Sequence, residues 1–321
     1  MNTLWNKYPF IYSELENVVD IMKNNAVNRE KTIENSLLDL INSGGKLLRP
    51  AFLIISAGFG NYVSEKFCNL AAVVEMLHMA TLVHDDIVDD AITRRGSQTI
   101  QSKYGKDYAV FMGDLLFSRC FMLLSSNTSM ENMKLLSEAI FNICTGEIEQ
   151  FSSQFSKEVS VKKYLKRIAA KTAALFSISF YVGSAESGCS KEVVSNLSKI
   201  GYDIGMAFQI IDDILDYTGQ ADLVGKPVGN DLKEGIYTLP LIYALKADKT
   251  SSLEKLLKND YTDEDVCKII DITDNLGGID KARALAKRYT KRSFDRIAKL
   301  PDCDSKNILR ELAEMLLSRK Y

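Results

Sequence analysis

The chain contains few of the residues that break helices or crosslink a chain. Its 321 residues include five prolines, one tryptophan and two histidines. Its six cysteines form no CxxC pair and several lie in apolar runs; they are Cys68, Cys120, Cys144, Cys189, Cys267 and Cys303. Scattered thiols of this kind are typical of buried free cysteines and disfavour a disulfide framework. We therefore expect a reducing, cytoplasmic location.

The chain also lacks a basic excess, a signal peptide and an uninterrupted apolar run. Forty Lys and Arg against forty-two Asp and Glu leave no basic balance for nucleic acid or an anionic membrane. The N-terminal sequence MNTLWNKYPFIYSELENVV has neither a basic n-region nor an apolar h-region. The most apolar windows are interrupted by Glu75 and both histidines, or by Asp203, Gln209 and Asp212. We therefore expect no transmembrane segment.

Apolar residues recur at three- and four-residue spacing over long stretches, and no strand-like alternation is sustained. The expected helices include residues 33–40, 68–88, 108–124, 133–151, 164–183, 193–217 and 308–317. The stretches ending at 88 and 217 are apolar nearly all round, which predicts burial at the centre of a bundle. No low-complexity linker divides the chain. We therefore predict an all-α protein with residues 1–321 in a single domain.

Two acidic clusters end two of these apolar helices. The first lies in TLVHDDIVDD at residues 81–90, and the second is DDILD at residues 212–216. Asp85 and Asp89, like Asp212 and Asp216, are spaced i,i+4 and so share one helix face. A glycine soon after each cluster places the aspartates in C-terminal turns, where the helix dipole disfavours an anion by roughly 0.3–1 kcal/mol. Like charges at i,i+4 cost about 0.2–0.5 kcal/mol more.

The same penalty on two helices indicates a bound cation. Carboxylate oxygens, with neither cysteine nor a second histidine at ligand spacing, favour Mg²⁺ over Zn²⁺. A solvated acidic helix end, with Asp90 paired to Arg94 at i,i+4, would explain one cluster alone. Two clusters on buried helices favour the metal.

Several basic residues stand alone in apolar or glycine-rich segments. They are Lys46 and Arg49 in SGGKLLRP, Arg94 and Arg95 in TRRG, Lys171 in AAKTAALF and Lys226 in VGKPVGNDL. Arginine forks, lysine charges and glycines that expose backbone N–H groups are what phosphate binding needs. Each segment alone could be only a turn or a loop. Together with the aspartates, and without a nucleophilic triad, they favour a Mg²⁺–diphosphate site.

Seven segments occur in order over nearly the whole chain: SGGKLLRP, EMLHMATLVHDDIVDDAITRRG, FMGDLLFSR, GEIEQ, KTAALF, GMAFQIIDDILDYTG and GKPVGNDLKEG followed by TLP. In this order they resemble the trans-isoprenyl diphosphate synthase (polyprenyl synthetase) family. DDIVD resembles the first Asp-rich motif of that family, and DDILD resembles the second. The resemblance implies a single large helical bundle of the isoprenoid synthase type around a central deep active-site cavity.

The resemblance also implies roles for individual residues. Asp85 and Asp89 would bind two Mg²⁺ ions, and Asp212, supported by Asp216, a third. The allylic diphosphate would be held by Arg94, Lys171 and Lys226, and isopentenyl diphosphate by Lys46, Arg49, His78 and Arg95. Thr172 and Gln209 would contact the allylic substrate and stabilise its cation. One departure is Ile236, where the family often has a lysine, which removes one possible diphosphate contact.

The activity implied is the condensation of isopentenyl diphosphate with an allylic diphosphate such as farnesyl or geranylgeranyl diphosphate. Ionisation, condensation and elimination would give an all-trans polyprenyl diphosphate and pyrophosphate. One turn before Asp85, Ala80 and Thr81 are small, where short-chain members typically carry a bulky aromatic residue. We therefore expect a medium- or long-chain product, whose apolar tail allows peripheral membrane contact.

Several alternatives stay open within this resemblance. We expect a homodimer, but EGIYTLP is similar to the large subunits of heptaprenyl synthases, so a catalytic subunit of a heteromer is the second hypothesis. A short-chain farnesyl or geranylgeranyl synthase is a third. A non-catalytic regulatory subunit is disfavoured because both Asp-rich motifs are intact. A terpene cyclase would differ in its second metal motif and would not need GGKLLRP, and a head-to-head synthase would carry two Asp motifs of different spacing.

Overall fold

The computed structural model describes residues 2–94, 96–219 and 229–317, which form two compact units. Unit 1 comprises Met1–Leu136, Ser179–Leu197 and Pro301–Leu309, and unit 2 comprises Ser137–Ile178, Ser198–Leu300 and Arg310–Tyr321. The expectation of a single domain stays a prediction.

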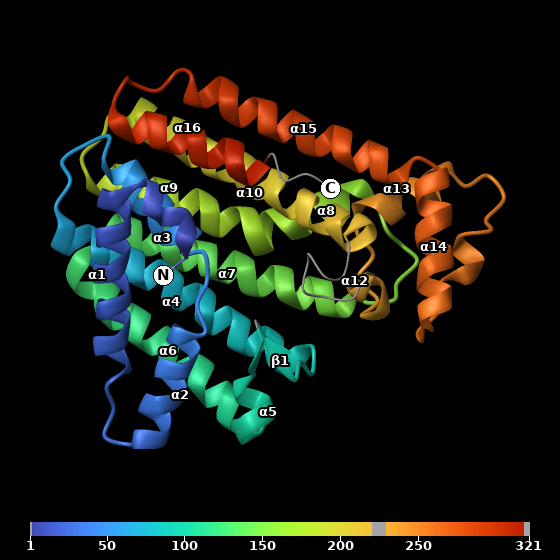
Figure 1. Cartoon of the computed structure of the whole chain (residues 1–321), viewed down its shortest axis with the longest axis horizontal. Coiled ribbons are helices and arrows are strands. Elements are labelled where there is room, and N and C mark those ends of the chain that lie inside the picture. Colours follow the sequence, from blue (N-terminus) through green and yellow to red (C-terminus); the bar gives the residue numbers. More distant parts are fainter. Residues whose placement is uncertain (1, 95, 220–228, 318–321) are drawn as a thin grey trace. The chain divides into compact units, whose positions relative to one another are not determined.

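Unit 1 is built mainly from the first part of the chain (Figure 1). Its elements are η1 (Thr3–Lys7), α1 (Pro9–Ala26), α2 (Lys31–Asn42), α3 (Leu48–Ala57), α4 (Ser64–Val88), β1 (Thr93–Arg94), β2 (Ser97–Gln98), α5 (Ile100–Tyr104) and α6 (Lys106–Asn127). The two short strands form an antiparallel hairpin in which Thr93 pairs with Gln98.

The later elements lie in unit 2 or pass from one unit to the other. They are α7 (Met130–Ser152), α8 (Val161–Ile168), η2 (Ala169–Ala173), α9 (Ala174–Glu186), α10 (Lys191–Thr218), α12 (Asn230–Lys233), α13 (Leu239–Ala247), η3 (Glu254–Leu256), α14 (Asp263–Asn275), α15 (Gly278–Ile297) and α16 (Asp304–Leu317). All seven expected stretches are helical, which confirms the all-α class.

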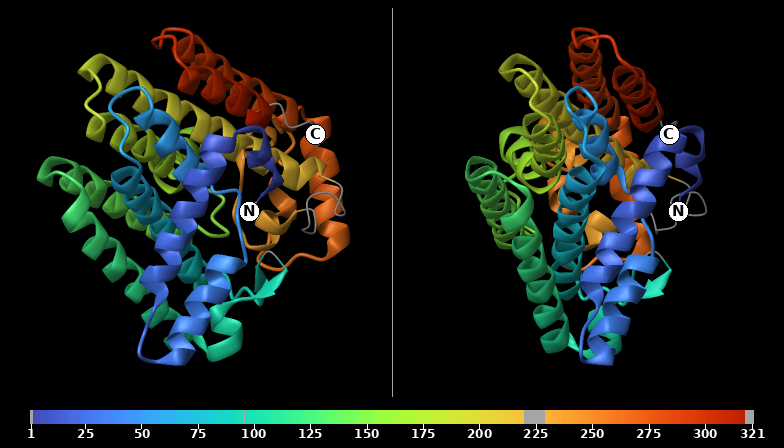
Figure 2. Two further views of the ribbon diagram at one scale, coloured as in Figure 1. Left: turned by 60° about the vertical axis from the view of Figure 1, so that its left-hand side comes forward. Right: turned by 90° about the vertical axis from the view of Figure 1, so that its left-hand side faces the viewer.

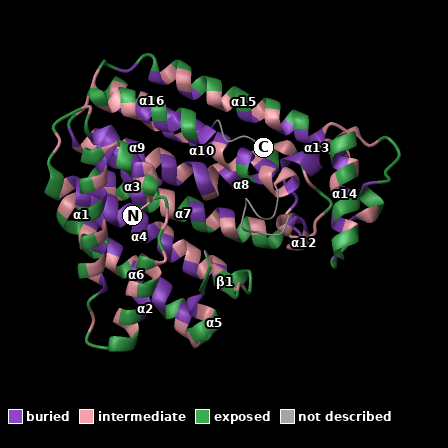
Figure 3. Cartoon of the chain, viewed as in Figure 1, coloured by how far each residue is buried: buried purple, intermediate pink, exposed green. Residues whose placement is uncertain are grey.

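Helix α4 is the core of unit 1. It packs against α1, α3 and α6, and Figures 2 and 3 show it beside α1 and largely buried. Residues from Phe67 to Leu77 are buried almost without interruption, as the all-round apolar sequence predicts. A Cβ on Gly113 of α6 would lie 2.3 Å from the His84 ring nitrogen, so glycine permits this close approach of α6 to α4.

In unit 2, a close helix contact positions candidate site residues. A Cβ on Gly205 of α10 would lie 2.7 Å from the Ala173 Cα atom, so α10 meets the η2 turn at short range. That turn is a π-helix, inserted in what the sequence predicts as one continuous helix over 164–183. Single π turns often occur at functional sites because they redirect the helix face. Here the turn carries Lys171 and Thr172.

Three helical segments are long and apolar enough to cross a membrane by length and composition: Ser64–Val88, Lys106–Asn127 and Val161–Glu186. The sequence predicts that no stretch qualifies as a membrane span, and on these two criteria that prediction is wrong. The polar residues that interrupt the apolar windows are too few to lower their mean hydropathy enough. Packing accounts for the apolarity of the first segment, since 72% of its apolar window is buried inside the protein. The window of α6 is only 33% buried, so α6 exposes apolar side chains.

Candidate active site

The first Asp-rich cluster lies where the sequence predicts, at the C-terminal end of a buried helix. Helix α4 ends at Val88, and Asp89 follows as its C-cap, with its N–H bonded to the Asp85 carbonyl at 2.9 Å. Asp85 is half-buried and Asp89 is exposed. Both carboxylates are therefore held at the negative end of the helix dipole, where a cation would stabilise them.

Arg94, predicted to hold the allylic diphosphate, is paired with Asp86 and not with Asp90. Its Nε donates to Asp86 Oδ1 at 2.5 Å, whereas Asp90 pairs with Lys106. The alternative of a solvated helix end, with Asp90 paired to Arg94 at i,i+4, needs a helix that continues past Asp90. Helix α4 ends at Val88 and Asp90 takes a left-handed backbone (φ 49°), so Arg94 in β1 contacts the last helical turn instead. Burial raises the pKa of Asp86, and Arg94 opposes that rise.

The residues predicted for isopentenyl diphosphate lie on α3, α4 and the loop before α3. Lys46 is exposed in that loop, and Arg49 lies half-buried in the first turn of α3. His78 is half-buried on α4, and its carbonyl accepts a hydrogen bond from the Thr81 hydroxyl at 2.8 Å. Arg95 lies outside the described residues.

Two small residues of α4 are predicted to limit product length. Ala80 is fully buried and Thr81 is half-buried. Thr81 precedes Asp85 by four residues and shares its helix face, whereas Ala80 precedes it by five and faces another side of α4. Their role in chain length stays a prediction.

In unit 2, the predicted Thr172 and Gln209 are in direct contact. The Thr172 hydroxyl donates to Gln209 Oε1 at 2.6 Å, and Gln209 Nε2 donates to Asp213 Oδ1 at 2.8 Å. The other Asp213 oxygen accepts from the Tyr164 hydroxyl at 2.6 Å. Asp213 is buried, so its carboxylate fixes the side-chain amide of Gln209 from one side while Tyr164 fixes Asp213 from the other.

The remaining aspartates of the second cluster differ in environment. Asp212 is exposed, whereas Asp216 accepts backbone N–H groups of Asn230 (3.1 Å) and Asp231 (3.3 Å). Asp216 thus holds the segment that follows the glycine-rich loop, in keeping with a supporting role. Burial, reinforced by neighbouring carboxyls, raises the pKa of Asp231 well above its usual value, and burial raises that of Asp213.

Lys171, predicted to hold the allylic diphosphate, is paired with a carboxylate. Its Nζ lies 2.7 Å from Glu147 Oε2 on α7, with both side chains partly exposed. A diphosphate would compete with Glu147 for this ammonium group. Lys226 lies outside the described residues, and Lys233 is paired with Asp263 at 2.5 Å.

Three residues of this region were not assigned roles from the sequence. Tyr164 precedes Lys171 by seven residues, two helical turns, so a shared helix face was the signal that could have identified it. Glu147 and Asp231 lie in the quoted segments GEIEQ and GKPVGNDLKEG. Only the fold shows that Glu147 pairs with Lys171 and that Asp231 lies near the second acidic cluster.

The donors present fit a hard divalent cation. No group of three or more His, Cys, Asp or Glu residues forms a ready-made metal site in residues 2–94, 96–219 and 229–317. The carboxylates of the two clusters are hard oxygen donors, of the kind that bind a divalent cation together with waters and substrate phosphates. The raised pKa of Asp231, set by burial and by nearby carboxyls, marks an acidic environment that a cation would relieve.

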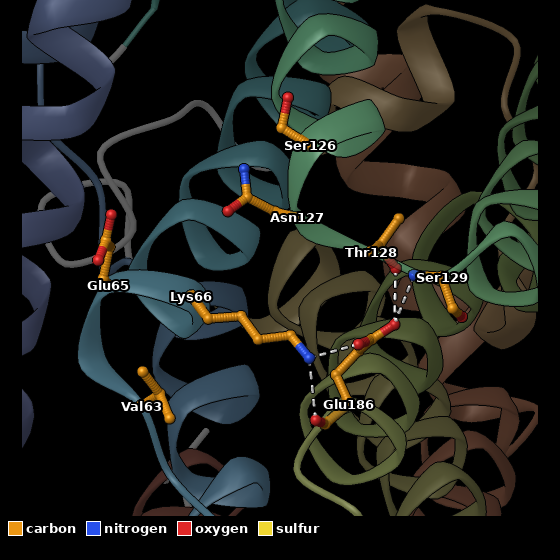
Figure 4. Close-up of a pocket in the computed structure, with 8 residues that line it drawn as sticks. All are labelled: Val63, Glu65, Lys66, Ser126, Asn127, Thr128, Ser129 and Glu186. Atoms are coloured by element: carbon orange, nitrogen blue, oxygen red, sulfur yellow. Dashed lines mark hydrogen bonds and ion pairs between the residues drawn. The ribbon is translucent and has the colours of Figure 1, made fainter.

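A polar pocket of about 440 Å³ opens at the other end of α4 (Figure 4). There Glu186 accepts hydrogen bonds from Lys66, Thr128, Asn132 and the Ser129 N–H. Lys66 precedes Asp85 by nineteen residues, roughly 28 Å along the helix axis. The contacts in this pocket join the N-terminal end of α4 to Glu186, the last residue of α9, and the pocket is not the reaction site.

Comparisons with known proteins identify the family of the chain. The polyprenyl synthetase family model matches residues 30–273. The chain is 34% identical to heptaprenyl diphosphate synthase component 2 of Bacillus subtilis, over 98% of this chain and 92% of that protein. A crystal structure of heptaprenyl diphosphate synthase from Staphylococcus aureus is similar with a TM-score of 0.92 and 35% identity, covering 97% of this chain and 99% of that one.

A second crystal structure was solved with ligands. It is a polyprenyl synthase from Caulobacter crescentus CB15 complexed with calcium and isoprenyl diphosphate, with a TM-score of 0.91 and 31% identity over 98% of this chain and 97% of that one. The predicted enzyme class and isoprenoid synthase fold are thereby confirmed. The chain belongs to the polyprenyl synthetase family, the trans-isoprenyl diphosphate synthases, whose members are prenyltransferases.

Proposed function

We propose that this prenyltransferase condenses isopentenyl diphosphate with an allylic diphosphate, such as farnesyl or geranylgeranyl diphosphate, to give an all-trans medium- or long-chain polyprenyl diphosphate and pyrophosphate. The hydrogen-bonded series Thr172–Gln209–Asp213–Tyr164 carries the proposal. Within it, Thr172 and Gln209 present uncharged oxygen dipoles, with Thr172 buried and Gln209 half-buried. Such dipoles stabilise a developing allylic cation without trapping it as a strong nucleophile would.

Each group of residues has one task in this proposal. Lys171 and Arg94 bind the allylic diphosphate, with Lys226 of the glycine-rich loop. Gln209 and the Thr172 carbonyl lie against the allylic carbon as its bond to oxygen breaks. Lys46 and Arg49 hold the diphosphate of isopentenyl diphosphate while its double bond attacks. The leaving pyrophosphate takes the proton whose loss restores the alkene.

We propose that Asp85, Asp89 and Asp212, with Asp216 in support, bind Mg²⁺, three ions per active site. When bound, Mg²⁺ neutralises charge on the departing pyrophosphate. The hard oxygen donors of both clusters support this choice of ion. The Caulobacter structure, of a relative with 31% identity, is complexed with calcium and isoprenyl diphosphate, which also supports a divalent cation.

We propose a homodimer in the cytoplasm. Helix α6 supports the dimer, since Phe111, Phe121 and Met122 are 72%, 45% and 60% exposed on one helix, an apolar surface that a second copy would cover. The alternative is a heteromer, because the Bacillus relative is described as component 2 of its synthase. The six free cysteines agree with a reducing compartment.

A pyrophosphate-release assay tests the reaction. The purified chain should release pyrophosphate only when isopentenyl diphosphate, an allylic diphosphate and Mg²⁺ are all present, and a chelator should stop it. Release that needs no isopentenyl diphosphate would indicate a cyclase or a phosphatase instead. Activity of the chain alone would reject an obligatory partner.

A further inference from the structure

The only tryptophan of the chain contacts the loop predicted to hold isopentenyl diphosphate. Trp5 is fully buried in the η1 turn. Its indole Nε1 donates to the Lys46 carbonyl oxygen at 2.8 Å, across 41 residues of sequence. This hydrogen bond joins the N-terminal turn to SGGKLLRP at the residue whose ammonium group is predicted to bind a diphosphate.

The loop has a backbone that needs external support. Leu47, next to Lys46, is a non-glycine residue in the left-handed region (φ 50°, ψ 38°), and no side chain caps α3, which it precedes. The Cβ atom of an L-residue lies too close to the following carbonyl oxygen in this conformation, so the conformation persists only where surrounding contacts determine it. On the α3 side, Leu48 and Ala51 are buried in the core. On the other side, the Trp5 hydrogen bond fixes the Lys46 carbonyl.

The η1 turn is itself anchored. The Asn2 side chain accepts the Leu4 N–H at 3.0 Å, and the Tyr8 N–H donates to the Trp5 carbonyl at 2.9 Å. Helix α1 follows at once and packs against α3 and α4. Trp5 is therefore held on the same body of helices that carries Arg49 and His78.

We propose that Trp5 is a positioning residue for isopentenyl diphosphate, acting through the Lys46 carbonyl to set the direction of the Lys46 side chain. The inference rests on the proposed function, since Lys46 is the residue through which it acts. Trp5 itself contacts neither substrate. Its loss should therefore weaken isopentenyl diphosphate binding more than it slows the reaction.

Replacement of Trp5 by phenylalanine tests whether binding of isopentenyl diphosphate is affected more than the rate, because it removes the indole N–H and keeps an aromatic ring. We expect the KM for isopentenyl diphosphate to rise about three- to tenfold, the factor that one hydrogen bond supplies. The kcat and the KM for the allylic diphosphate should change less than about twofold. Ile11→Val, a buried change on α1 away from the loop, is the matched control and should leave all three constants unchanged.

Intrinsic fluorescence gives a second readout on the unaltered protein, because Trp5 is the sole tryptophan. Titration with isopentenyl diphosphate should change its emission saturably, and Lys46→Met should weaken the apparent affinity. An unchanged KM in Trp5→Phe, or equal changes in all three kinetic constants, would overturn the inference and leave the proposed function standing. An enzyme that never consumes isopentenyl diphosphate would instead overturn the proposed function.

Discussion

Gln209 and Asp213, one turn apart on α10, are joined by a hydrogen bond of 2.8 Å that determines which end of the glutamine amide faces Thr172. Because the Asp213 carboxylate only accepts, Gln209 must turn its NH₂ group towards it and its oxygen towards Thr172. Tyr164 donates to the second Asp213 oxygen and prevents the carboxylate from rotating. Asp213 contacts no substrate in the proposed mechanism, yet it sets the direction of the Gln209 amide that is predicted to stabilise the allylic cation.

Asp213→Asn should reverse that polarity. With the Tyr164 hydroxyl donating to the asparagine oxygen, its NH₂ group faces Gln209, which then turns its own NH₂ group towards Thr172. We expect kcat to fall about a hundredfold, similar to the loss of one oriented dipole at a reacting charge. The change is measured at saturating Mg²⁺ and substrates, with circular dichroism to verify folding.

A double-mutant cycle separates this effect from a change in metal binding beside Asp212. If Asp213 acts through Gln209, then Asp213→Asn should cost little more in a Gln209→Leu background. Fully additive losses would contradict the assignment. Tyr164→Phe should give a smaller loss of kcat in the same direction.

The pKa of Glu186 predicts a pH dependence of stability. Four donors, with Lys66 first among them, lower the pKa of this carboxyl from 4.5 to about 2 against the effect of its burial. Since the folded pKa lies below the unfolded one, the carboxylate stabilises unit 1 above about pH 4.5, and this stabilisation is lost as the pH falls through about 2. At neutral pH it contributes about 3 kcal/mol.

Urea unfolding of the wild type and of Glu186→Gln should therefore differ most at pH 7, with the gap closing between pH 5 and pH 2. Glu192→Gln, an exposed change on α10, is the control and should follow the wild type. A gap that does not narrow in acid would show that the variant loses packing rather than a charge.

Product length should depend on the small residues of α4. Ala80→Tyr places a ring one turn before Asp85, where it would block a growing chain, and we expect a shorter product by chromatography. Since Ala80 is fully buried, overpacking costs roughly 1–3 kcal/mol. Thr81→Phe at a half-buried position is a milder second variant, and unchanged length in both folded variants would place the limit elsewhere.

Each acidic cluster should be needed for metal-dependent turnover. Asp85→Ala and Asp212→Ala should reduce activity at least about a thousandfold while leaving thermal unfolding near that of the wild type, because Asp85 is only half-buried and Asp212 is exposed. Asp90→Asn is the matched control, since Asp90 pairs with Lys106 at the surface and asparagine tolerates its left-handed backbone, and this variant should retain activity. An active Asp85→Ala or Asp212→Ala variant would contradict the metal assignment.

The sequence was sufficient to predict the helices that carry the two Asp-rich clusters. Helices α4 and α10 have a strong apolar pattern, and their aspartates lie near the C-terminal ends as expected, within the last two turns or just beyond the last residue. The alternative in which Asp90 pairs with Arg94 fails because α4 ends at Val88 and Asp90 takes a left-handed backbone, which the apolar pattern of the helix does not indicate.

Long-range contacts could not be predicted from spacing alone. The Trp5–Lys46 hydrogen bond joins residues 41 apart, and the Tyr164–Asp213 bond joins residues 49 apart. Likewise, the π turn at Ala169–Ala173 is a backbone change within an apolar run that suits an ordinary helix. Each depends on tertiary packing rather than on local preference.

Elongation by the purified chain tests the central claim most directly. Labelled isopentenyl diphosphate is incubated with Mg²⁺ and either farnesyl or geranylgeranyl diphosphate, and the product is separated by chain length. We predict label in an all-trans polyprenyl diphosphate longer than geranylgeranyl diphosphate, formed by this chain without another subunit. No labelled product longer than the primer, with or without candidate partner subunits, would contradict the account.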